Sequence, residues 1–222
     1  MIKYEFQKRI LSSIILIPIT IFFIFQGTVF FCFFLCVLFL ATSYEWIKMN
    51  KTYPLRTVGI CYLFFAFVIA YLLREKFSLG LFILVLIICI FTDLGGYIFG
   101  KIFKGPKLIK ISPKKTYAGA IGGFILSLVA ALFYSKHTAL GVVTFLNLSL
   151  WTDIALNKIY FLFILFISFI SQVGDLIISY FKRLAKVKNT GNLLPGHGGL
   201  LDRLDGIIFA IPISYLLLSY LK

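Results

Sequence analysis

Residues 171–206 decide the fold and the expected chemistry, and they read SQVGDLIISYFKRLAKVKNTGNLLPGHGGLLDRLDG. The stretch begins inside an apolar segment, continues through a basic segment and a glycine-rich turn, and enters a second apolar segment with two aspartates. It thereby places three carboxylates, Asp175, Asp202 and Asp205, near lysines, arginines and glycines. Hard oxygen ligands beside cations and adaptable backbone suit a divalent metal and a phosphate group.

The composition is that of an integral membrane protein. Of the 222 residues, 61% are hydrophobic and 18% aromatic, and the mean hydropathy is +1.02. Because a helix needs about 20 apolar residues to cross a bilayer, this length allows about seven or eight spans. We therefore expect an all-α polytopic helix bundle with membrane lipids as its surroundings.

The charge is strongly positive, at +14. The cations lie in short loops between apolar runs, where they orient a chain in the membrane, and no segment resembles a fold that enters a nucleic-acid groove. We therefore expect no nucleic-acid partner. The four cysteines lie in apolar runs without a C-x-x-C pair, which argues against disulfides and zinc.

The apolar runs lie at residues 10–25, 29–43, 58–73, 79–99, 118–134, 140–151, 159–181 and 207–221. The run 140–151 is too short to cross unaided. We read the first run as a retained span, because no small-residue cleavage site follows it. With a cytoplasmic amino terminus, seven full spans and one partial span place the basic loops on the cytoplasmic side. Eight full spans are the alternative.

Aspartates inside apolar runs indicate function, since an ionised carboxylate at mid-bilayer costs about 2.5–3.5 kcal/mol on insertion scales. Asp93 and Asp175 are both of this kind. Polar residues around Asp175 recur every three or four positions and share one helix face; they are Ser171, Asp175, Ser179, Lys182 and Lys186. The alternative is a polar contact between helices in which Asp175 pairs with a lysine.

Asp202 and Asp205 are three residues apart at the start of the last helix, so their carboxylates share a face. Taken alone they also fit an amino-terminal cap. Together with Asp175 they favour Mg²⁺ or Mn²⁺ over zinc. In the preceding turn, glycines can direct backbone N–H groups at an anion. His197 could act as an acid, as a base or as a hydrogen-bond donor to phosphate. An ordinary surface residue is an equally good interpretation.

A second basic segment follows the run 79–99. Six lysines lie from Lys101 to Lys115, and residues 112–116, SPKKT, lead into the next apolar run. Lysines near a membrane surface attract anionic headgroups by about 1 kcal/mol each, and we expect Thr116 to cap a helix whose amino end favours phosphate. For the outer lysines, a role in topology alone is the alternative. Upstream, Gly96 and Gly100 share a face with Asp93, where small residues allow a helix or a substrate to approach.

Together these segments resemble the signature of phosphatidate cytidylyltransferases, also called CDP-diacylglycerol synthases. The resemblance covers roughly residues 93–206, and two positions depart from it: Asn189 stands where aspartate is usual, and Ala118 where glutamate is usual. The matching segments are Ser112-Pro113-Lys114-Lys115-Thr116 with Gly119, Ser171-Gln172-x-Gly174-Asp175, Ser179-x-x-Lys182-Arg183 with Lys188, Pro195-Gly196-His197-Gly198-Gly199, and Asp202-Arg203-Leu204-Asp205.

The resemblance implies transfer of a cytidylyl group from CTP to phosphatidate, giving CDP-diacylglycerol and pyrophosphate for phospholipid biosynthesis. It implies that Asp175, Asp202 and Asp205 hold one or two Mg²⁺ or Mn²⁺ ions. The remaining catalytic residues would be Lys182, Arg183, Lys188, His197 and Arg203. The substrate-binding residues would be Asp93, Ser112, Pro113, Lys114, Lys115, Thr116, Ser179, Gly196, Gly198 and Gly199.

The expected organisation is a single membrane domain, 1–222, with packing helices in residues 1–92 and the catalytic half in residues 93–222. We expect a bacterial plasma (inner) membrane and a site that faces the cytoplasm, and a homodimer is one open assembly. Two other functions stay open. A CTP-dependent lipid-alcohol (polyprenol) kinase would make a phosphorylated polyprenol and CDP. A secondary transporter would show a pair of broken spans in its two halves, and the sequence has no such pair.

Overall fold

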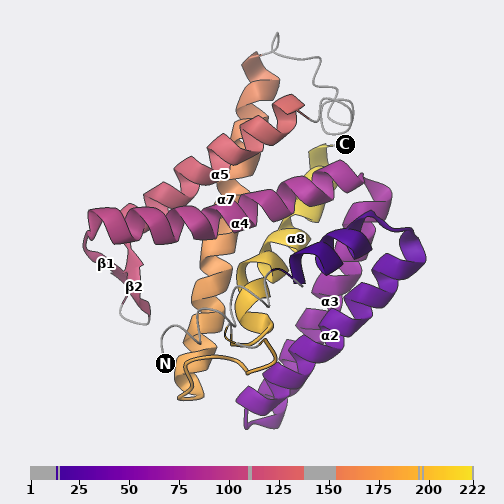
Figure 1. Ribbon diagram of the computed structural model, residues 1–222, viewed down its shortest axis with the longest axis vertical. Coiled ribbons are helices and arrows are strands. Elements are labelled where there is room, and N and C mark those ends of the chain that lie inside the picture. The colour runs from indigo at the N-terminus through magenta and orange to yellow at the C-terminus, as the bar shows by residue number, and fades with distance from the viewer. Residues whose placement is uncertain are drawn as a thin grey trace. The chain divides into compact units, whose positions relative to one another are not determined.

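The computed structural model describes residues 14, 16–109, 112–137, 154–194, 196 and 198–221 (Figure 1). Within these residues, six helices are long and apolar enough to cross a membrane, and a shorter apolar helix, Leu16–Phe25, precedes them. The all-α membrane fold is therefore confirmed. The long helices are α2 (Thr28–Met49), α3 (Tyr53–Lys76), α4 (Leu79–Phe103), α5 (Tyr117–His137), α7 (Ile154–Leu184) and α8 (Leu201–Leu221).

Each long helix contains one of the predicted apolar runs and extends beyond it. The extension matters most in α8, which begins at Leu201, six positions before its apolar run, so that Asp202 and Asp205 both lie in the helix as expected. The run 140–151 and the basic residues before the first run lie outside the described residues.

The chain divides into two compact units. Unit 1 comprises Met1–Tyr71 and Phe181–Leu204, and unit 2 comprises Leu72–Tyr180 and Asp205–Lys222.

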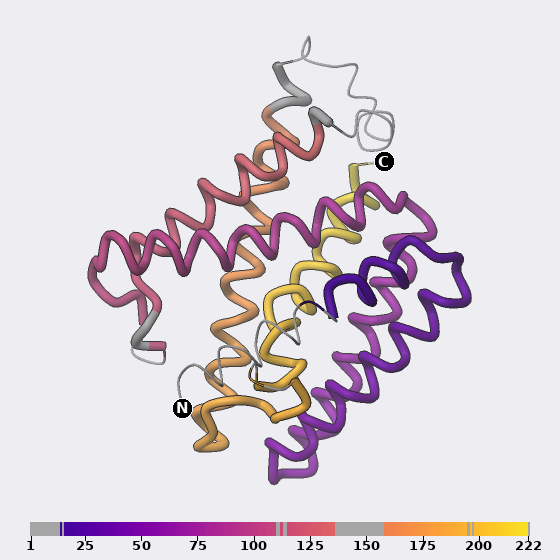
Figure 2. The backbone as a smooth tube through the Cα atoms, in the orientation of Figure 1, coloured from indigo at the N-terminus to yellow at the C-terminus, as the bar shows by residue number. Residues whose placement is uncertain are grey.

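In unit 1, α2 and the first part of α3 form a helical hairpin, which Figure 2 traces in indigo and purple. The rings of Phe39 and Phe64 meet edge to face at 5.8 Å between the two helices. Near the end of α2, Trp46 Nε1 donates to the Leu55 carbonyl at 3.0 Å. The same indole meets the ring of Phe181 edge to face at 5.1 Å. The carboxyl end of α2 is thus fixed by an aromatic anchor, since a buried indole pairs its N–H and packs its ring.

In unit 2, α4 and α5 cross at a distance that only glycine allows. A Cβ atom built on Gly95 would overlap the Gly122 carbonyl, and one on Gly123 would lie 2.9 Å from the Thr92 carbonyl oxygen. Small residues let helix backbones approach closely in membranes. This crossing confirms that the small residues on this part of α4 admit another helix.

A two-stranded antiparallel hairpin connects α4 to α5, where the sequence indicated only a basic segment. Its strands are β1 (Lys107–Ile109) and β2 (Ser112–Thr116), and the ribbon shows them at one end of α4 (Figure 1). Directly after β2, the Gly119 N–H donates to Thr116 Oγ1 at 3.1 Å. The expected cap of α5 is therefore confirmed.

Within unit 2, α7 and α8 also come into backbone contact. A Cβ atom on Gly174 would lie 2.9 Å from the Asp205 carbonyl oxygen, and one on Gly206 would lie 3.0 Å from the Ser171 carbonyl oxygen. Asp175 follows Gly174, so this crossing places the residues around Asp175 and Asp205 on neighbouring helices. Gly174 of the predicted signature is thus used for helix packing.

The glycine crossing predicts a contrast between two adjacent substitutions. Gly95→Ala should destabilise the protein by about 1–3 kcal/mol, the usual cost of overpacking, because its methyl would meet the Gly122 backbone. Gly96→Ala places its Cβ 3.8 Å from the Gly119 carbonyl oxygen, so it should be neutral or slightly stabilising, since alanine is favoured in helices by about 0.5–1 kcal/mol. Thermal unfolding in detergent measures both variants, and equal midpoints would contradict the close crossing.

Candidate active site

The first candidate cluster lies in unit 2, where Asp175 of α7 meets the basic hairpin. Lys115 Nζ forms an ion pair with Asp175 Oδ2, and the two side chains are 27% and 24% exposed. Ser179 donates from its Oγ to Asp175 Oδ1 at 3.3 Å. The helix face predicted through Asp175 and Ser179 is therefore present, and so is the lysine partner of the alternative interpretation. A partly accessible carboxylate that already binds an ammonium group is suited to exchange that cation for another.

Asp205 is the second carboxylate of unit 2. Its side chain is buried at 6% exposure, and its Oδ1 accepts from the Gly206 N–H at 2.9 Å. Burying a carboxylate costs several kcal/mol unless hydrogen bonds or cations compensate for it. Asp205 is buried beside the crossing of α8 with α7, and it therefore stays a candidate site residue.

The second cluster, here called the loop cluster, lies in unit 1. It consists of the end of α7, the described residues of the segment 185–200 and the first turn of α8. Lys182 Nζ lies 2.8 Å from Asp202 Oδ1, with both side chains 11% exposed. Asp202 Oδ2 accepts from the Thr190 N–H at 2.9 Å and the Gly199 N–H at 3.1 Å. Asp202 therefore joins the last turn of α7, the segment after it and the start of α8.

The glycine-rich turn of the loop cluster is closed by backbone hydrogen bonds. Leu194 and Gly198 exchange N–H···O bonds of 3.0 and 3.2 Å. Gly196 and Gly198 have φ of 77° and 91°, a region that side chains disfavour, so the predicted need for glycine is confirmed at these two positions. Pro195 and His197 lie outside the described residues.

The end of α7 corrects one expectation. Lys186 was placed on the helix face of Asp175, but α7 ends at Leu184, and Lys186 has a left-handed φ of 56°. The Val187 N–H donates to the Lys182 carbonyl and the Lys186 N–H to the Arg183 carbonyl. This bond pattern is a Schellman motif, which turns the chain away before Lys186 can extend the face.

Three further cations of the predicted set lie at the surface of the loop cluster. Arg183, Lys188 and Arg203 are all exposed, and Arg183 Nη1 also reaches the Val187 carbonyl at 3.5 Å. Exposed cations around a helix start and a glycine-rich turn favour binding of an anion.

The remaining predicted substrate-binding residues divide by position. Asp93 is exposed on α4, while Ser112 and Thr116 are half-buried on β2. The side chains of Pro113 and Lys114 lie outside the part of the chain that the structure describes. The two departures from the family pattern also have places: Asn189 is exposed beside Gly198 in the loop cluster, and Ala118 packs near Gly105 in unit 2.

One buried carboxylate that contacts the loop cluster was missed by the sequence interpretation. Glu45 of α2 is 1% exposed and accepts hydrogen bonds from Thr190 Oγ1, Leu200 N and Leu201 N, each at 2.9 Å. It is one acidic residue at the end of an apolar run, with Thr42 and Lys48 three positions before and after it. An acidic residue directly after a long apolar run was the signal in the sequence that could have found it.

A divalent cation such as Mg²⁺ or Mn²⁺ needs several oxygen ligands around one point. Within the described residues, no three His, Cys, Asp or Glu side chains are grouped closely enough to bind a metal ion; Asp202 belongs to unit 1, and Asp175 and Asp205 to unit 2. Asp175 and Asp202 each bind a lysine ammonium group. Both carboxylates therefore already bind a cation. Carboxylate oxygens are the type of donor that Mg²⁺ and Mn²⁺ prefer, and the binding of one ion by all three aspartates stays a prediction.

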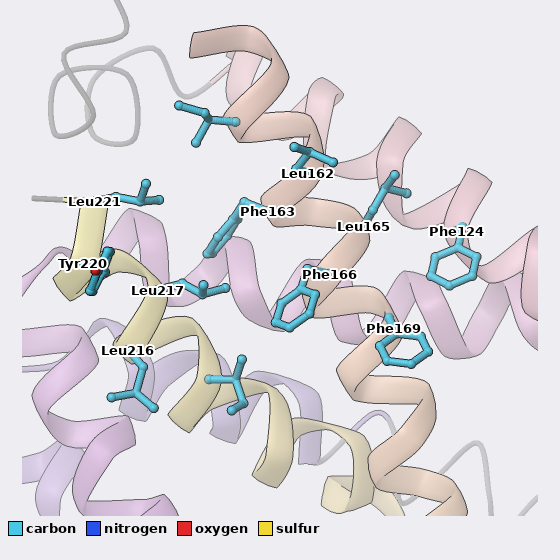
Figure 3. Close-up of a pocket in the computed structure, with 12 residues that line it drawn as sticks. Phe124, Leu162, Phe163, Leu165, Phe166, Phe169, Leu216, Leu217, Tyr220 and Leu221 are labelled. Carbon is cyan, nitrogen blue, oxygen red and sulfur yellow. The ribbon is translucent and has the colours of Figure 1, made fainter. Parts of the chain in front are cut away.

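An apolar groove lies in unit 2, between α5, α7 and α8, with a volume of about 960 Å³. Phe163, Phe166 and Phe169 of α7 line it together with Leu216 and Leu217 of α8 (Figure 3). None of its lining residues is acidic or basic. The groove therefore offers no group for phosphate chemistry.

Comparison with known proteins identifies the family. Residues 53–221 match the model of the cytidylyltransferase family. The chain belongs to this family. Two curated relatives, the phosphatidate cytidylyltransferases of Staphylococcus saprophyticus and Staphylococcus aureus, are 34% and 36% identical over 81% of this chain and 57% of their own length. The phosphatidate cytidylyltransferase of Rickettsia conorii is 34% identical over 99% of this chain and 94% of its own length. The chain thus spans little more than half of its two Staphylococcus relatives. Both clusters fall mainly within the matched cytidylyltransferase segment, whereas Glu45 precedes it.

Proposed function

We propose that this chain transfers a cytidylyl group from CTP to phosphatidate, forming CDP-diacylglycerol and pyrophosphate. The observation that carries the proposal is the family match over residues 53–221, together with relatives that are named phosphatidate cytidylyltransferase. The lysine-paired carboxylates support it, because they supply both kinds of group that phosphoryl transfer requires, cation ligands and phosphate-binding cations.

The proposed reaction needs no nucleophilic side chain. A phosphate oxygen of phosphatidate attacks the α-phosphorus of CTP, a new P–O bond forms, and the bond to the β-phosphate breaks with pyrophosphate as the leaving group. Both reactants are anions, so the protein must neutralise charge and align the phosphates. The residues proposed for neutralisation are Lys182, Arg183, Lys188 and Arg203, with Lys115 on the hairpin; His197 remains a proposed participant.

We propose that Asp175, Asp202 and Asp205 hold one or two Mg²⁺ or Mn²⁺ ions. When held by these carboxylates, such an ion would supply positive charge for the phosphate oxygens and for in-line displacement. Lys115 and Lys182, which pair with Asp175 and Asp202, would then be released toward phosphate groups. The other proposed substrate contacts come from Ser179, Asp93, residues 112–116 and the glycines of the turn.

The proposal includes a place in the cell. The chain is an integral membrane protein, and we assign it to a bacterial plasma membrane with the site facing the cytoplasm, because the positive-inside rule favours the cytoplasmic side for the basic loops of the sequence. A homodimer is the proposed assembly, which chemical crosslinking in native membranes would test.

Two labels on CTP test the reaction directly. Purified protein with Mg²⁺ and phosphatidate should move label from the cytidine ring of CTP into the lipid fraction. Label in the γ-phosphate should leave as pyrophosphate. The lipid-alcohol kinase predicts the reverse: with a polyprenol acceptor, γ-phosphate enters the lipid and cytidine stays in water. An absence of cytidine in the lipid fraction would overturn the proposed function.

A further inference from the structure

The buried carboxylate of Glu45 connects α2 to the start of α8. Its Oε1 accepts from the Leu200 N–H and its Oε2 from the Leu201 N–H, both at 2.9 Å. Leu201 is the first residue of α8, and the first N–H groups of a helix have no partner within the helix. Glu45 therefore caps α8 from 155 and 156 positions away in the chain, where the helix dipole favours a negative charge.

Thr190 joins this cap to Asp202. Its Oγ1 donates to Glu45 Oε2, and its N–H donates to Asp202 Oδ2, both at 2.9 Å. Asp202 also holds Lys182 at 2.8 Å. A displacement of Glu45 would therefore move Thr190, and with it one of the groups that orient Asp202.

Two glycines show that the space around this carboxylate is filled. A Cβ atom on Gly199 would lie 2.6 Å from Glu45 Oε2, and one on Gly191 would lie 2.5 Å from Glu45 Oε1. Within the described residues, no lysine or arginine forms an ion pair with Glu45. The negative charge of Glu45 is therefore compensated by two backbone N–H groups and a hydroxyl, an arrangement that resembles an anion site occupied by the protein's own carboxylate.

The end of α2 that contains Glu45 is also anchored by the neighbouring residue. Trp46, the next residue, donates from its indole N–H to Leu55 and packs against Phe181, and Phe181 precedes Lys182. Rotation of the end of α2 would thus break an aromatic contact with the last turn of α7. The position of Glu45 is thus also fixed by the contacts that Trp46 makes with Leu55 and Phe181.

We propose that Glu45 is a positioning residue for the reaction: it fixes Thr190 and the first turn of α8, so that Asp202 and Lys182 are held ready for the triphosphate of CTP. This inference rests on the proposed function. Glu45 lies before residues 53–221, the segment that the family model covers, and it does not touch the reacting groups itself. Its effect is on the geometry of the loop cluster.

Glu45→Gln tests the proposal, because the amide keeps the size but loses the charge and one acceptor oxygen. Initial rates per folded protein are measured against CTP and against phosphatidate in detergent micelles. We expect KM for CTP to rise about tenfold, within the range for leaving buried donors unpaired, while KM for phosphatidate stays within about twofold. The matched control is Glu75→Gln, because Glu75 lies at the end of α3 and pairs with Arg74; it should leave both KM values unchanged.

The outcomes separate positioning from simple stability. A purely structural role would lower the amount of folded protein and leave both KM values unchanged. That result for Glu45→Gln would overturn the proposal. If Glu45→Gln does not fold, Thr190→Val removes only one of the three hydrogen bonds, and KM for CTP should rise about threefold to fivefold. An unchanged KM for CTP in Thr190→Val would also contradict the role. Inactive wild-type protein would instead overturn the proposed function, and the role of Glu45 with it.

Discussion

Asp202→Asn is expected to lower the rate of CDP-diacylglycerol formation by about 10²–10³-fold, the usual cost of removing one preorganised electrostatic contact. Asp202 accepts two backbone N–H groups and binds Lys182. The carbonyl oxygen of asparagine can still accept a hydrogen bond, but the uncharged amide cannot neutralise Lys182 or serve as an anionic metal ligand. The measurement is the transfer of labelled cytidine into the lipid fraction.

The Asp202→Asn result needs a control for folding, since the same carboxylate orders the loop cluster. Breaking a buried ion pair by removing one partner costs about 3–5 kcal/mol. Thermal midpoints are therefore measured beside the rates, and Lys182→Met, which removes the other partner, reports on the ion pair without changing the carboxylate. Equal turnover by wild-type protein and Asp202→Asn would remove Asp202 from the proposed metal ligands.

The second large effect is expected at Asp175. Asp175→Asn should lower turnover by about 10²–10³-fold, because it removes an anionic ligand and leaves Lys115 without its partner. The alternative that Asp175 serves only to pair with a lysine between α7 and β2 is tested by exchanging the charges in the double variant Asp175→Lys, Lys115→Asp. An ion pair needs opposite charges in either order, whereas a metal ligand at position 175 must be an anion.

The charge exchange thus separates packing from chemistry. We expect the double variant to recover much of the thermal stability that either single substitution loses, and to remain inactive. Recovery of turnover together with stability would show that Asp175 acts through its ion pair alone. Double-mutant comparison is suitable here because the two side chains are in direct contact.

Much of the fold and part of the site could be predicted from local pattern. Six apolar runs became spans because membrane helices are specified by length and hydropathy. The face through Asp175 and Ser179 followed from helical spacing, and the Thr116 cap followed from a hydroxyl directly before a helix. These features depend on neighbours within a few residues, so the sequence alone contains them.

The remaining features depend on partners far apart in the chain. Glu45 binds groups 145 to 156 positions away, so no local spacing could reveal its role. The pairing of Lys115 with Asp175 was open in the sequence, because six lysines lie from Lys101 to Lys115 and their spacing does not say which one pairs with an aspartate. Lys186 was misplaced because the helix pattern continues past the left-handed residue that ends α7. Tertiary contact and backbone reversal, which periodicity does not encode, account for these differences.

The central claim is that Asp175, Asp202 and Asp205 hold a divalent cation on which cytidylyl transfer depends. The most direct measurement is titration of the purified chain with Mn²⁺, with the unbound ion followed by its electron paramagnetic resonance signal. We expect saturable binding by wild-type protein and by Glu75→Gln, and a loss of at least about tenfold in affinity in Asp175→Asn, Asp202→Asn and Asp205→Asn, as removal of a charged ligand implies. Undiminished Mn²⁺ binding by all three asparagine variants would contradict the claim.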